Sequence, residues 1–485
     1  MKLPTQAAIG SAIRTAIAAP TRRDNSKTSP IIAIATGNGN AGVGIVRISG
    51  EEEDVKALFQ KMFPGKEIKP RYAELLPIRD TQGQILDTGI VIYFRAPFSY
   101  TGESVLELQV HGGRVLLNWI VQEVLIFGKE FGLRQALPGE FTERAFLNGK
   151  IDLVQAEAVA DLIEANSRNA AKAASRSLTG EFSNKVNALN DALINLRVEV
   201  EAILDFPEEE IDFLSEYQSQ EKLEDIQNRL ESVLDSARQG EILRDGLRVA
   251  LVGETNVGKS SLLNYLAGEE IAIVSDIAGT TRDKIQTDLI ISGVPFHFVD
   301  TAGIRETEDR IEQIGIERTK QEISKADVIL EIRDIRDQQN KNKDSMQTAL
   351  KMIKGKDVPI ITVLNKVDLI STPLPNTKDV SRGTIIETSA VTGKGMQELK
   401  SELLKLAGFS ENQSIYMARE RHIHNLRNVK ESLKRAASYL NSTSPQLELF
   451  AEELRGASDE LGEITGKISS DDLLGKIFSG FCIGK

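Results

Sequence analysis

A glycine-rich segment in the middle of the chain carries the clearest chemistry. The residues GETNVGKS, from Gly253 to Ser260, follow the apolar run RVALV and precede SLLNYL, which continues as a helix. The glycines let backbone N–H groups close around phosphate oxygens, and the amino end of the helix adds a positive dipole. Lys259 can reach the β- and γ-phosphates of a nucleotide, and the Ser260 hydroxyl can bind Mg²⁺. The segment therefore predicts a P-loop.

Two later motifs fit the same site. GTTRD supplies Thr280 and Thr281, whose hydroxyls can reach a magnesium ion from a loop. The strand-like run FHFVD ends at Asp300, which is placed for a water-mediated contact with the same ion. In the DTAG sequence that begins there, the N–H of Gly303 can bond to the γ-phosphate. The order of the motifs indicates a nucleotide hydrolase.

Two further segments are suited to reading the base of the nucleotide. The run PIITVLNKVD ends in Asn365, Lys366, Val367 and Asp368. The Asp368 carboxylate can accept hydrogen bonds from guanine N1–H and N2–H₂, which adenine cannot offer, and such buried polar contacts discriminate strongly. IIETSA then brings Ser389 near the base, where a backbone N–H can reach guanine O6. We therefore predict GTP rather than ATP.

The group that would orient the attacking water is less evident. At the position after DTAG where many small GTPases carry Gln stands Ile304, which can neither donate nor accept a hydrogen bond. Carboxylates follow at Glu306, Glu308, Asp309 and Glu312, although any one of them fits a solvated helix face equally well. No arginine-finger motif is evident. Charge compensation is therefore expected from a bound ion or a second subunit.

Changes in periodicity indicate how the chain is organised around this site. Residues 31–150 read as β-rich. Their GNGNAG matches a dinucleotide-binding fingerprint, but that fingerprint must open a helix, and here the strand-like VGIVRIS follows. Apolar residues recur at helical spacing in 151–246 and 408–485, whereas 247–407 alternates strands and helices. Because insertions occur where domain termini lie close together, we expect an α/β domain inserted into one discontinuous helical domain. Two unrelated helical domains are the alternative.

Composition excludes several classes of protein. Of 485 residues, none lie in an apolar run approaching the roughly 20 residues of a membrane span. The net charge of −12 argues against binding nucleic acid through charge alone, and a single cysteine excludes an intrachain disulfide. Residues 1–30 read as a flexible extension, or alternatively as a transit peptide. The expected location is the cytoplasm, or an organelle in the second case.

With these motifs, the chain resembles the MnmE (TrmE) family of tRNA modification GTPases over about residues 31–485. The likeness is close in PGEFTERAFLNGKIDLVQAEA (138–158), in DFPEEEIDF (205–213), in the GTPase motifs and in the closing DDLLGKIFSGFCIGK. It implies a homodimer with a multidomain α/β plus all-α fold. An α+β folate-binding and dimerisation domain occupies 31–150, and a P-loop GTPase domain with a mostly parallel sheet is inserted into the helical domain.

The resemblance also implies an activity and partners. Together with an MnmG-type FAD protein, in an expected heterotetramer, such proteins add a (carboxymethyl)aminomethyl group at C5 of the wobble uridine of certain tRNAs. The one-carbon unit comes from a tetrahydrofolate derivative, 5-formyl- or 5,10-methylene-tetrahydrofolate. GTP hydrolysis depends on K⁺ and on GTPase domains meeting across the dimer, and no membrane is involved. A ribosome-assembly GTPase is the alternative, but no basic RNA-binding domain is evident beside the nucleotide motifs.

Site residues follow from the same resemblance. It implies that Asn256, Ser275, Ile277 and Thr280 bind K⁺, that Ser260 and Thr281 bind Mg²⁺, and that Glu312 positions the water. The K⁺ ion would supply the positive charge that an arginine supplies elsewhere. The residues expected around GTP are Gly253, Asn256, Val257, Gly258, Lys259, Ser260, Ser261, Ser275, Asp276, Ile277, Ala278, Gly279, Thr280, Thr281, Asp300, Thr301, Ala302, Gly303, Asn365, Lys366, Asp368, Ser389 and Ala390.

The implied folate residues are Arg47, Glu107, Lys150 and Lys485. A carboxylate can pair with the amino and ring N–H edge of a pterin, and cations suit the glutamate tail of a folate. Without the resemblance, Arg47 and Glu107 would read as an ion pair on a strand surface. The folate assignment therefore depends on the family likeness.

The tail SGFCIGK holds the single cysteine, Cys482. CIGK departs from a prenylation box because Gly484 is not aliphatic and Lys485 is outside the usual terminal set. SSDDLLGKIF predicts a final helix capped by Ser469 or Ser470, which would present Cys482 just past its end. There the thiolate could attack a uridine carbon or assist one-carbon transfer, or the residue could simply pack and hold the tail.

Overall fold

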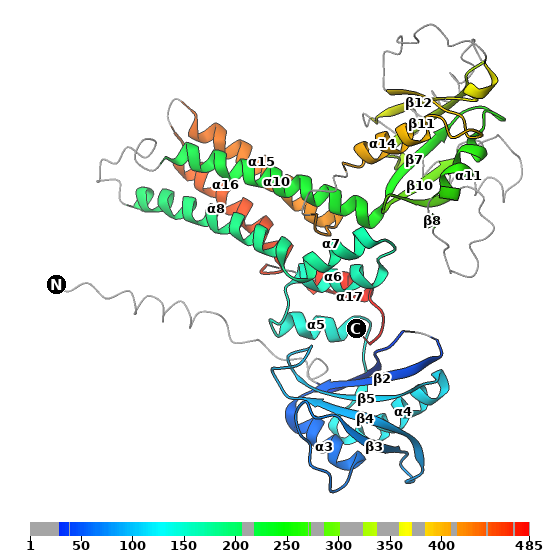
Figure 1. The fold of residues 1–485 in the computed structure, drawn as a ribbon. Coiled ribbons are helices and arrows are strands. Elements are labelled where there is room, and N and C mark those ends of the chain that lie inside the picture. Colours follow the sequence, from blue (N-terminus) through cyan, green and yellow to red (C-terminus); the bar gives the residue numbers. More distant parts are fainter. Residues whose placement is uncertain are drawn as a thin grey trace, which may run out of the picture. The chain divides into compact units, whose positions relative to one another are not determined.

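The computed structural model describes most of the chain, in two compact units (Figure 1). One unit contains the described residues of 29–152 and 471–484, and the other contains those of 153–468. The described residues are 29–37, 39–205, 218–269, 271–272, 286–300, 324–336, 358–370, 384–408, 415–442, 445–468 and 471–484. The predicted extension before residue 29 lies outside them. Within these ranges, no helix is long and apolar enough to cross a membrane.

A six-stranded sheet organises the N-terminal unit, in the order β3-β4-β5-β2-β1-β6. Its strands are β1 Ile31–Ile34, β2 Ala41–Gly50, β3 Glu74–Arg79, β4 Ile85–Phe94, β5 Ser104–Gly112 and β6 Arg134–Gln135. Neighbouring strands are antiparallel except β1 and β6. The predicted strand VGIVRIS forms part of β2, so the GNGNAG segment joins two strands and opens no helix.

The main core of this unit lies on one face of the sheet, and the opposite face is covered in part, where Ile31 and Ala33 of β1 pack with Phe141. Helices α3 (Glu52–Met62) and α4 (Arg114–Phe127) pack their apolar residues on the first face, forming a core with Val46, Leu106 and Leu108. Side chains alternate between the faces of a strand, so Arg47 and Glu107 point away from that core. The predicted folate residues of the strands lie on this opposite face, beside Phe141.

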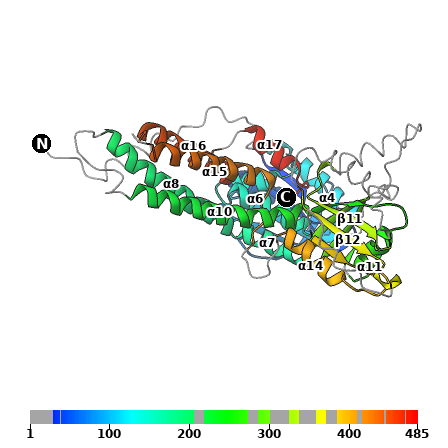
Figure 2. The same cartoon turned by 90° about the horizontal axis from the view of Figure 1, so that it is seen from above.

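The second unit contains a bundle built from both ends of its sequence. Helices α8 (Glu181–Asp205) and α10 (Ser219–Asp245) pack against α15 (Glu420–Leu440) and α16 (Leu447–Thr465), as two views of the ribbon show (Figures 1 and 2). The shorter α6 (Leu153–Glu164) and α7 (Arg168–Leu178) precede them. The predicted discontinuous helical domain is therefore confirmed. The DFPEEEIDF motif lies, beyond Asp205, outside the described residues.

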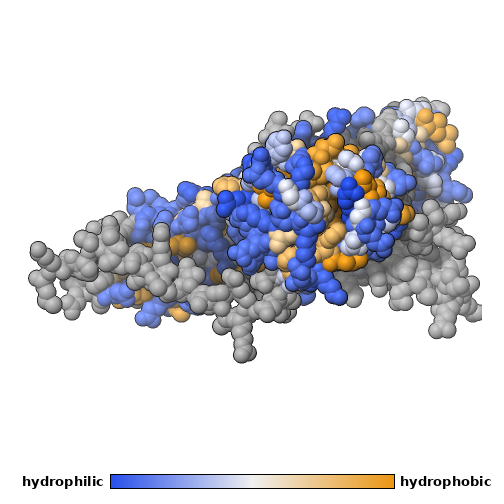
Figure 3. Space-filling view, turned by 90° about the horizontal axis from the view of Figure 1, so that it is seen from below, coloured by the Kyte–Doolittle hydropathy of each residue, from blue (hydrophilic) through white to orange (hydrophobic). Residues whose placement is uncertain are grey.

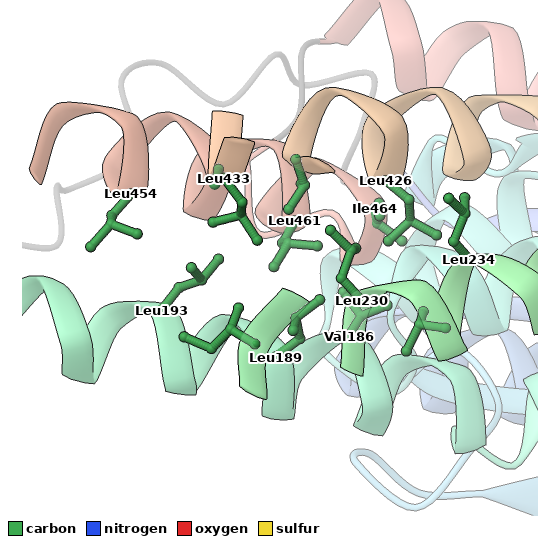
Figure 4. Packing of buried hydrophobic residues seen from close by; sticks show 14 of the residues in the cluster. Val186, Leu189, Leu193, Leu230, Leu234, Leu426, Leu433, Leu454, Leu461 and Ile464 are labelled. Atoms are coloured by element: carbon green, nitrogen blue, oxygen red, sulfur yellow. The ribbon is translucent and has the colours of Figure 1, made fainter. Parts of the chain in front are cut away.

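Leucines at helical spacing hold this bundle together. Leu193 of α8, Leu230 of α10, Leu433 of α15 and Leu461 of α16 point into one shared core (Figure 4). Each is at most 1% exposed. Truncating one such leucine to alanine typically costs about 2–5 kcal/mol of stability.

The inserted domain has a seven-stranded sheet in the order β13-β12-β11-β7-β10-β9-β8. Its strands are β7 Leu247–Val252, β8 Ile271–Ala272, β9 Gln286–Ile291, β10 Val294–Asp300, β11 Val328–Asp334, β12 Ile360–Asn365 and β13 Thr384–Glu387. The strands from β13 to β10 run parallel, and β9 and β8 are antiparallel to their neighbours. Helices α11 (Lys259–Glu269) and α14 (Met396–Leu406) flank the sheet. This is the mostly parallel sheet that the sequence predicts.

One carboxylate of α6 holds both connections between the bundle and the inserted domain. The Asp161 carboxylate accepts hydrogen bonds from Arg244, just before β7, at 3.1 Å and from Arg419, just before α15, at 2.8 Å. Its neighbour Glu157, which is 1% exposed, is paired bidentately with Arg421. Charges this deeply buried require such partners. The network therefore holds both connections between the bundle and the inserted domain against α6.

The C-terminal segment packs with the N-terminal unit. We expected 408–485 to form the second part of the helical domain, whereas the described residues from Asp471 onward cluster with the first 152 residues. Helix α17 (Asp471–Ser479) contacts α5 (Glu140–Leu147), and a β-bridge joins Ile483 to Pro138. The predicted final helix is thus present, while its two candidate caps lie outside the described residues.

Candidate functional site

The P-loop folds as the sequence predicts. Strand β7 ends at Val252, and helix α11 begins at Lys259. The Lys259 side chain is 7% exposed, and its Nζ donates to the carbonyls of Gly253 at 2.6 Å and Glu254 at 3.2 Å. The same nitrogen lies 3.7 Å from a carboxylate oxygen of Asp300, at the end of β10. The ammonium group is therefore held over the loop, next to the predicted magnesium carboxylate.

The two glycines of the loop are required by close approaches. A Cβ added to Gly253 would lie 2.5 Å from the carbonyl oxygen of Ile332. Gly258 has φ +101°, and a Cβ there would lie 2.2 Å from Nδ2 of Asn365. Side chains at either position would push the loop away from the sheet. A backbone cradle of this kind is what a bound phosphate group needs.

The predicted base-reading segments contact this loop directly. Asn365 is 2% exposed, and its Nδ2 donates to the carbonyl of Val257 at 2.9 Å. Its Oδ1 accepts from the Thr388 hydroxyl at 3.3 Å and from the backbone N–H of Ala390 at 3.4 Å. One buried amide thus joins the P-loop, the NKVD segment and the TSA segment, which lie far apart in the sequence.

The Asp368 carboxylate, predicted to bind guanine, accepts from the Ser389 hydroxyl at 2.6 Å. This contact fixes one carboxylate oxygen against the second base-reading segment. Lys366 lies beside it and donates from Nζ to the carbonyl of Asn256 in the P-loop at 2.5 Å. The predicted residues on both sides of the nucleotide are therefore preassembled.

Sequence reasoning missed one charged group at this edge of the sheet. Asp334, the last residue of β11, lies 2.9 Å from Nζ of Lys366 and is also paired bidentately with Arg336. Arg336, followed by Lys366, holds the pKa of Asp334 well below its usual range, so the carboxylate stays charged. The available signal was its place at the carboxyl end of a strand beside β7, where ligand groups gather in parallel sheets.

Several predicted residues lie outside the part of the chain that the structure describes. They are the K⁺, Mg²⁺ and nucleotide residues Ser275, Asp276, Ile277, Ala278, Gly279, Thr280, Thr281, Thr301, Ala302 and Gly303, together with Glu312 and Lys485. The described members of the two metal sites are Asn256 and Ser260, both with exposed side chains in the P-loop segment. Those roles stay predictions.

In the N-terminal unit, Arg47 and Glu107 are directly paired across strands β2 and β5. Arg47 Nε donates to Glu107 Oε1 at 2.8 Å, and the two side chains are 21% and 12% exposed. Among the described residues, none donates to Glu107 Oε2. The Arg47 guanidinium also lies 5.7 Å from the ring centre of Tyr100 and 5.8 Å from that of Phe141. The pair therefore combines a free acceptor atom with aromatic surfaces.

Other predicted residues of this unit are spread around it. Lys150 Nζ donates to the carbonyl of Pro97 at 3.0 Å. Cys482 is exposed beyond α17, and its carbonyl accepts from the N–H of Gly139 at 3.4 Å. The added Cβ of Gly484 would lie 2.1 Å from the carbonyl of Ile34, so the tail runs along the end of β1. That strand is the neighbour of β2, which carries Arg47.

Comparison with known proteins agrees with this arrangement. Residues 153–482 match the family described as the MnmE helical domain, and residues 30–150 match the GTP-binding protein TrmE N-terminus. The chain belongs to the MnmE family of tRNA modification GTPases. The resemblance seen in the sequence motifs is thereby confirmed, as are the GTP-hydrolysing class and the P-loop.

Individual relatives of the MnmE family align over nearly their full length. The tRNA modification GTPase MnmE of Bordetella petrii is 52% identical over 457 residues, covering 94% of this chain and 98% of its own. That of Burkholderia cenocepacia is 50% identical over 464 residues, covering 94% and 99%. Among solved structures, Aquifex aeolicus Era is 31% identical with a TM-score of 0.27, and the match covers 38% of this chain and 66% of that of Era.

Proposed function

We propose that this chain hydrolyses GTP, with Mg²⁺ and K⁺, to drive modification at C5 of the wobble uridine in certain tRNAs. The partner is an MnmG-type flavoprotein, the one-carbon donor is a tetrahydrofolate derivative, and the setting is the cytoplasm. The observation that carries the nucleotide half is the buried amide of Asn365, which joins the P-loop to both base-reading segments. The Asp368 carboxylate, which accepts from the Ser389 hydroxyl, favours a guanine base within this arrangement.

Mg²⁺ would be held by Ser260 and Thr281, where it would neutralise the charge of the phosphates. The exposed Ser260 at the start of α11 and Asp300 beside Lys259 are a donor set of hard oxygens, which suits this ion. Lys259 would move its ammonium from the loop carbonyls to the phosphates.

The hydrolytic step lacks a glutamine at Ile304, so we assign its electrostatic part to K⁺. Asn256 would bind the ion with Ser275, Ile277 and Thr280, and Glu312 would orient the attacking water. Asn256 supports this role because its side chain is exposed and its backbone, at φ +64°, is held by Lys366. A fixed cation stabilises charge that develops in the transition state.

The folate would bind on the sheet face opposite the main core, at Arg47 and Glu107, with Lys150 and Lys485 toward its glutamate tail. The orphan Oε2 of Glu107 can accept from the amino edge of a pterin, and the ring of Tyr100, which is 36% exposed, offers apolar contact. Burial raises the pKa of Tyr100, so the phenol stays protonated and donates or accepts as a neutral group. The residues present therefore fit such a ligand.

The same unit would form the homodimer. Leu75 and Ile90 are opposite each other on β3 and β4 and are 68% and 40% exposed, on the face away from the core. Apolar patches interrupt the hydrophilic surface on the side shown in Figure 3. Exposed apolar patches commonly mark a protein interface. Dimerisation would also bring two nucleotide-binding domains into one assembly.

Reconstituted modification tests the whole proposal. The chain, the flavoprotein, a reduced folate, GTP and unmodified tRNA are incubated together, and the wobble uridine is analysed by mass spectrometry. We expect the product only when every component is present, and Asp368→Asn should abolish it with GTP. Product formed equally well without GTP or without folate would contradict the proposal.

Cys482 is tested in the same system. If Cys482 is the nucleophile, Cys482→Ser removes its thiolate. Modification of the tRNA should then fall while GTP hydrolysis is unchanged. Full tRNA modification by this variant would reject the nucleophile and leave a packing role. Cys482→Ala controls for the loss of the side chain itself.

A further inference from the structure

Asp334 lies at the edge of the sheet where the nucleotide segments meet. It ends β11, which is hydrogen-bonded to the P-loop strand β7 on one side and to β12 on the other. On β12 its register partner is Asn365, and the next backbone N–H, that of Ile335, donates to the Asn365 carbonyl at 2.9 Å. The ladder therefore fixes the position of Asp334 relative to the NKVD segment.

Its carboxylate is the second partner of the Lys366 ammonium. Lys366 Nζ is 2.9 Å from Asp334 Oδ2 and 2.5 Å from the carbonyl oxygen of Asn256. The nitrogen thus bridges a fixed carboxylate to the backbone of the P-loop. Charge-assisted hydrogen bonds of this type are the strong ones in proteins.

The bridged residues have unusual backbones. Asn256 has φ +64° and Lys366 has φ +69°, both in the left-handed region that is disfavoured for residues other than glycine. Such conformations persist only where surrounding contacts over-determine them. The Asp334–Lys366–Asn256 bridge joins both residues and provides such contacts.

Arg336 fixes the orientation of the Asp334 carboxylate. Its Nε and Nη2 donate to Oδ1 and Oδ2 at 2.9 and 2.7 Å, and its backbone N–H donates to Oδ1 at 3.1 Å. Asp334 is 16% exposed, whereas Arg336 is 53% exposed. The inner side of the carboxylate is thereby left to Lys366.

We propose that Asp334 is a positioning residue of the GTPase site, which holds Lys366 against the Asn256 carbonyl and so presets the P-loop for the nucleotide and for the monovalent cation. The cation part rests on the proposed function, whereas the nucleotide part does not. Without the carboxylate, Lys366 is free to leave Asn256, and the loop must be ordered again at each binding event. Binding then costs more.

GDP binding tests the first part without any hydrolysis. With a fluorescent N-methylanthraniloyl GDP, Asp334→Ala should bind about tenfold more weakly than the wild type, the size expected for one lost charged hydrogen bond. Asp334→Asn keeps an acceptor oxygen, so its affinity for GDP should lie between those of the wild type and Asp334→Ala. Asp334→Ala binding with wild-type affinity overturns the proposal, and Asp334→Asn serves the same test if the alanine variant does not fold.

The matched control is Asp327→Ala, just before the amino end of the same strand. Its carboxylate accepts from the backbone N–H of Arg248 at 3.0 Å, away from the nucleotide edge. We expect this variant to lower the melting temperature but leave GDP affinity unchanged. Equal losses of GDP affinity in Asp327→Ala and Asp334→Ala would reduce Asp334 to a structural role and overturn the proposal.

Titration with K⁺ tests the second part. The K⁺ concentration that gives half-maximal GTP hydrolysis should rise about fivefold or more in Asp334→Ala, within the usual range of coupling between sites. An unshifted midpoint overturns the link to Asn256. If the wild type itself ignores K⁺, the cation mechanism of the proposed function fails, and GDP affinity alone decides on Asp334.

Discussion

The nucleotide site and the proposed folate site are built in different ways. The P-loop takes its phosphate cradle from consecutive residues between Gly253 and Ser260, because backbone N–H groups do the binding. The residues proposed for folate, Arg47, Glu107 and Lys150, are scattered over the first unit and would act through their side chains. A site made of local backbone leaves a signature in the sequence. A site made of distant side chains leaves only residues that also suit an ordinary ion pair.

The strongest test of the local site is Lys259→Ala. Its ammonium is the buried cation of the P-loop, and removing it should lower GTP turnover by about 10²–10³-fold, as for other lost electrostatic contacts to a reacting group. Steady-state phosphate release measures the loss. Folate retention should stay at the wild-type level, and a parallel loss would break the separation of the two sites.

Asp368→Asn should act on the choice of base. An amide cannot accept hydrogen bonds from both guanine N1–H and N2–H₂, so GTP affinity should fall about a hundredfold, corresponding to two charged hydrogen bonds. Xanthosine triphosphate carries an oxygen in place of the amino group and should bind the variant better than GTP does. Competition titrations give both values, and unchanged preference for GTP would contradict the assignment.

Much of the fold and the nucleotide half could be predicted because their signals are local. The spacing of the P-loop glycines and of the bundle leucines is visible in the sequence itself. Asp334 could not be found in this way, because its partner Lys366 is brought to it by the pairing of β11 with β12. The docking of the tail depends likewise on a bridge from Ile483 to Pro138, which no periodicity encodes.

Glu107→Gln tests the scattered site. The neutral amide loses the charge that favours a pterin amino edge, and tetrahydrofolate binding should weaken about tenfold. Equilibrium dialysis with a labelled reduced folate measures this affinity. GTP hydrolysis should be unaffected. Gln can still accept a hydrogen bond from Arg47. A large drop in melting temperature would therefore favour a purely structural ion pair between Arg47 and Glu107.

A smaller effect, on the free energy of unfolding, is expected from substituting His297, which joins the inserted domain to helix α10 of the bundle. His297 of β10 bonds Asp288 at 2.7 Å and the Asp245 carbonyl of α10 at 3.0 Å. The Asp288 hydrogen bond raises the pKa of His297 above its ordinary value. Its stabilising charge is therefore fully present below about pH 6.5 and is lost as pH rises through the raised pKa.

His297→Asn should accordingly reduce the free energy of unfolding by about 1 kcal/mol at pH 6 and by less at pH 9. Chemical denaturation at the two pH values measures the difference. Asp288→Asn is the matched control and should remove the same pH dependence. A cost that is identical at both pH values would contradict a charged His297.

In the proposed function, the catalytic charge missing beside Ile304 comes from a K⁺ ion at Asn256. The most direct measurement compares GTP turnover by the full-length chain in K⁺ and in Na⁺ at equal ionic strength, with Asn256→Ala alongside. We predict at least about tenfold faster turnover in K⁺, as for a lost electrostatic stabiliser, and no difference between the ions in the variant. Equal rates in K⁺ and Na⁺ for the wild type would contradict the account.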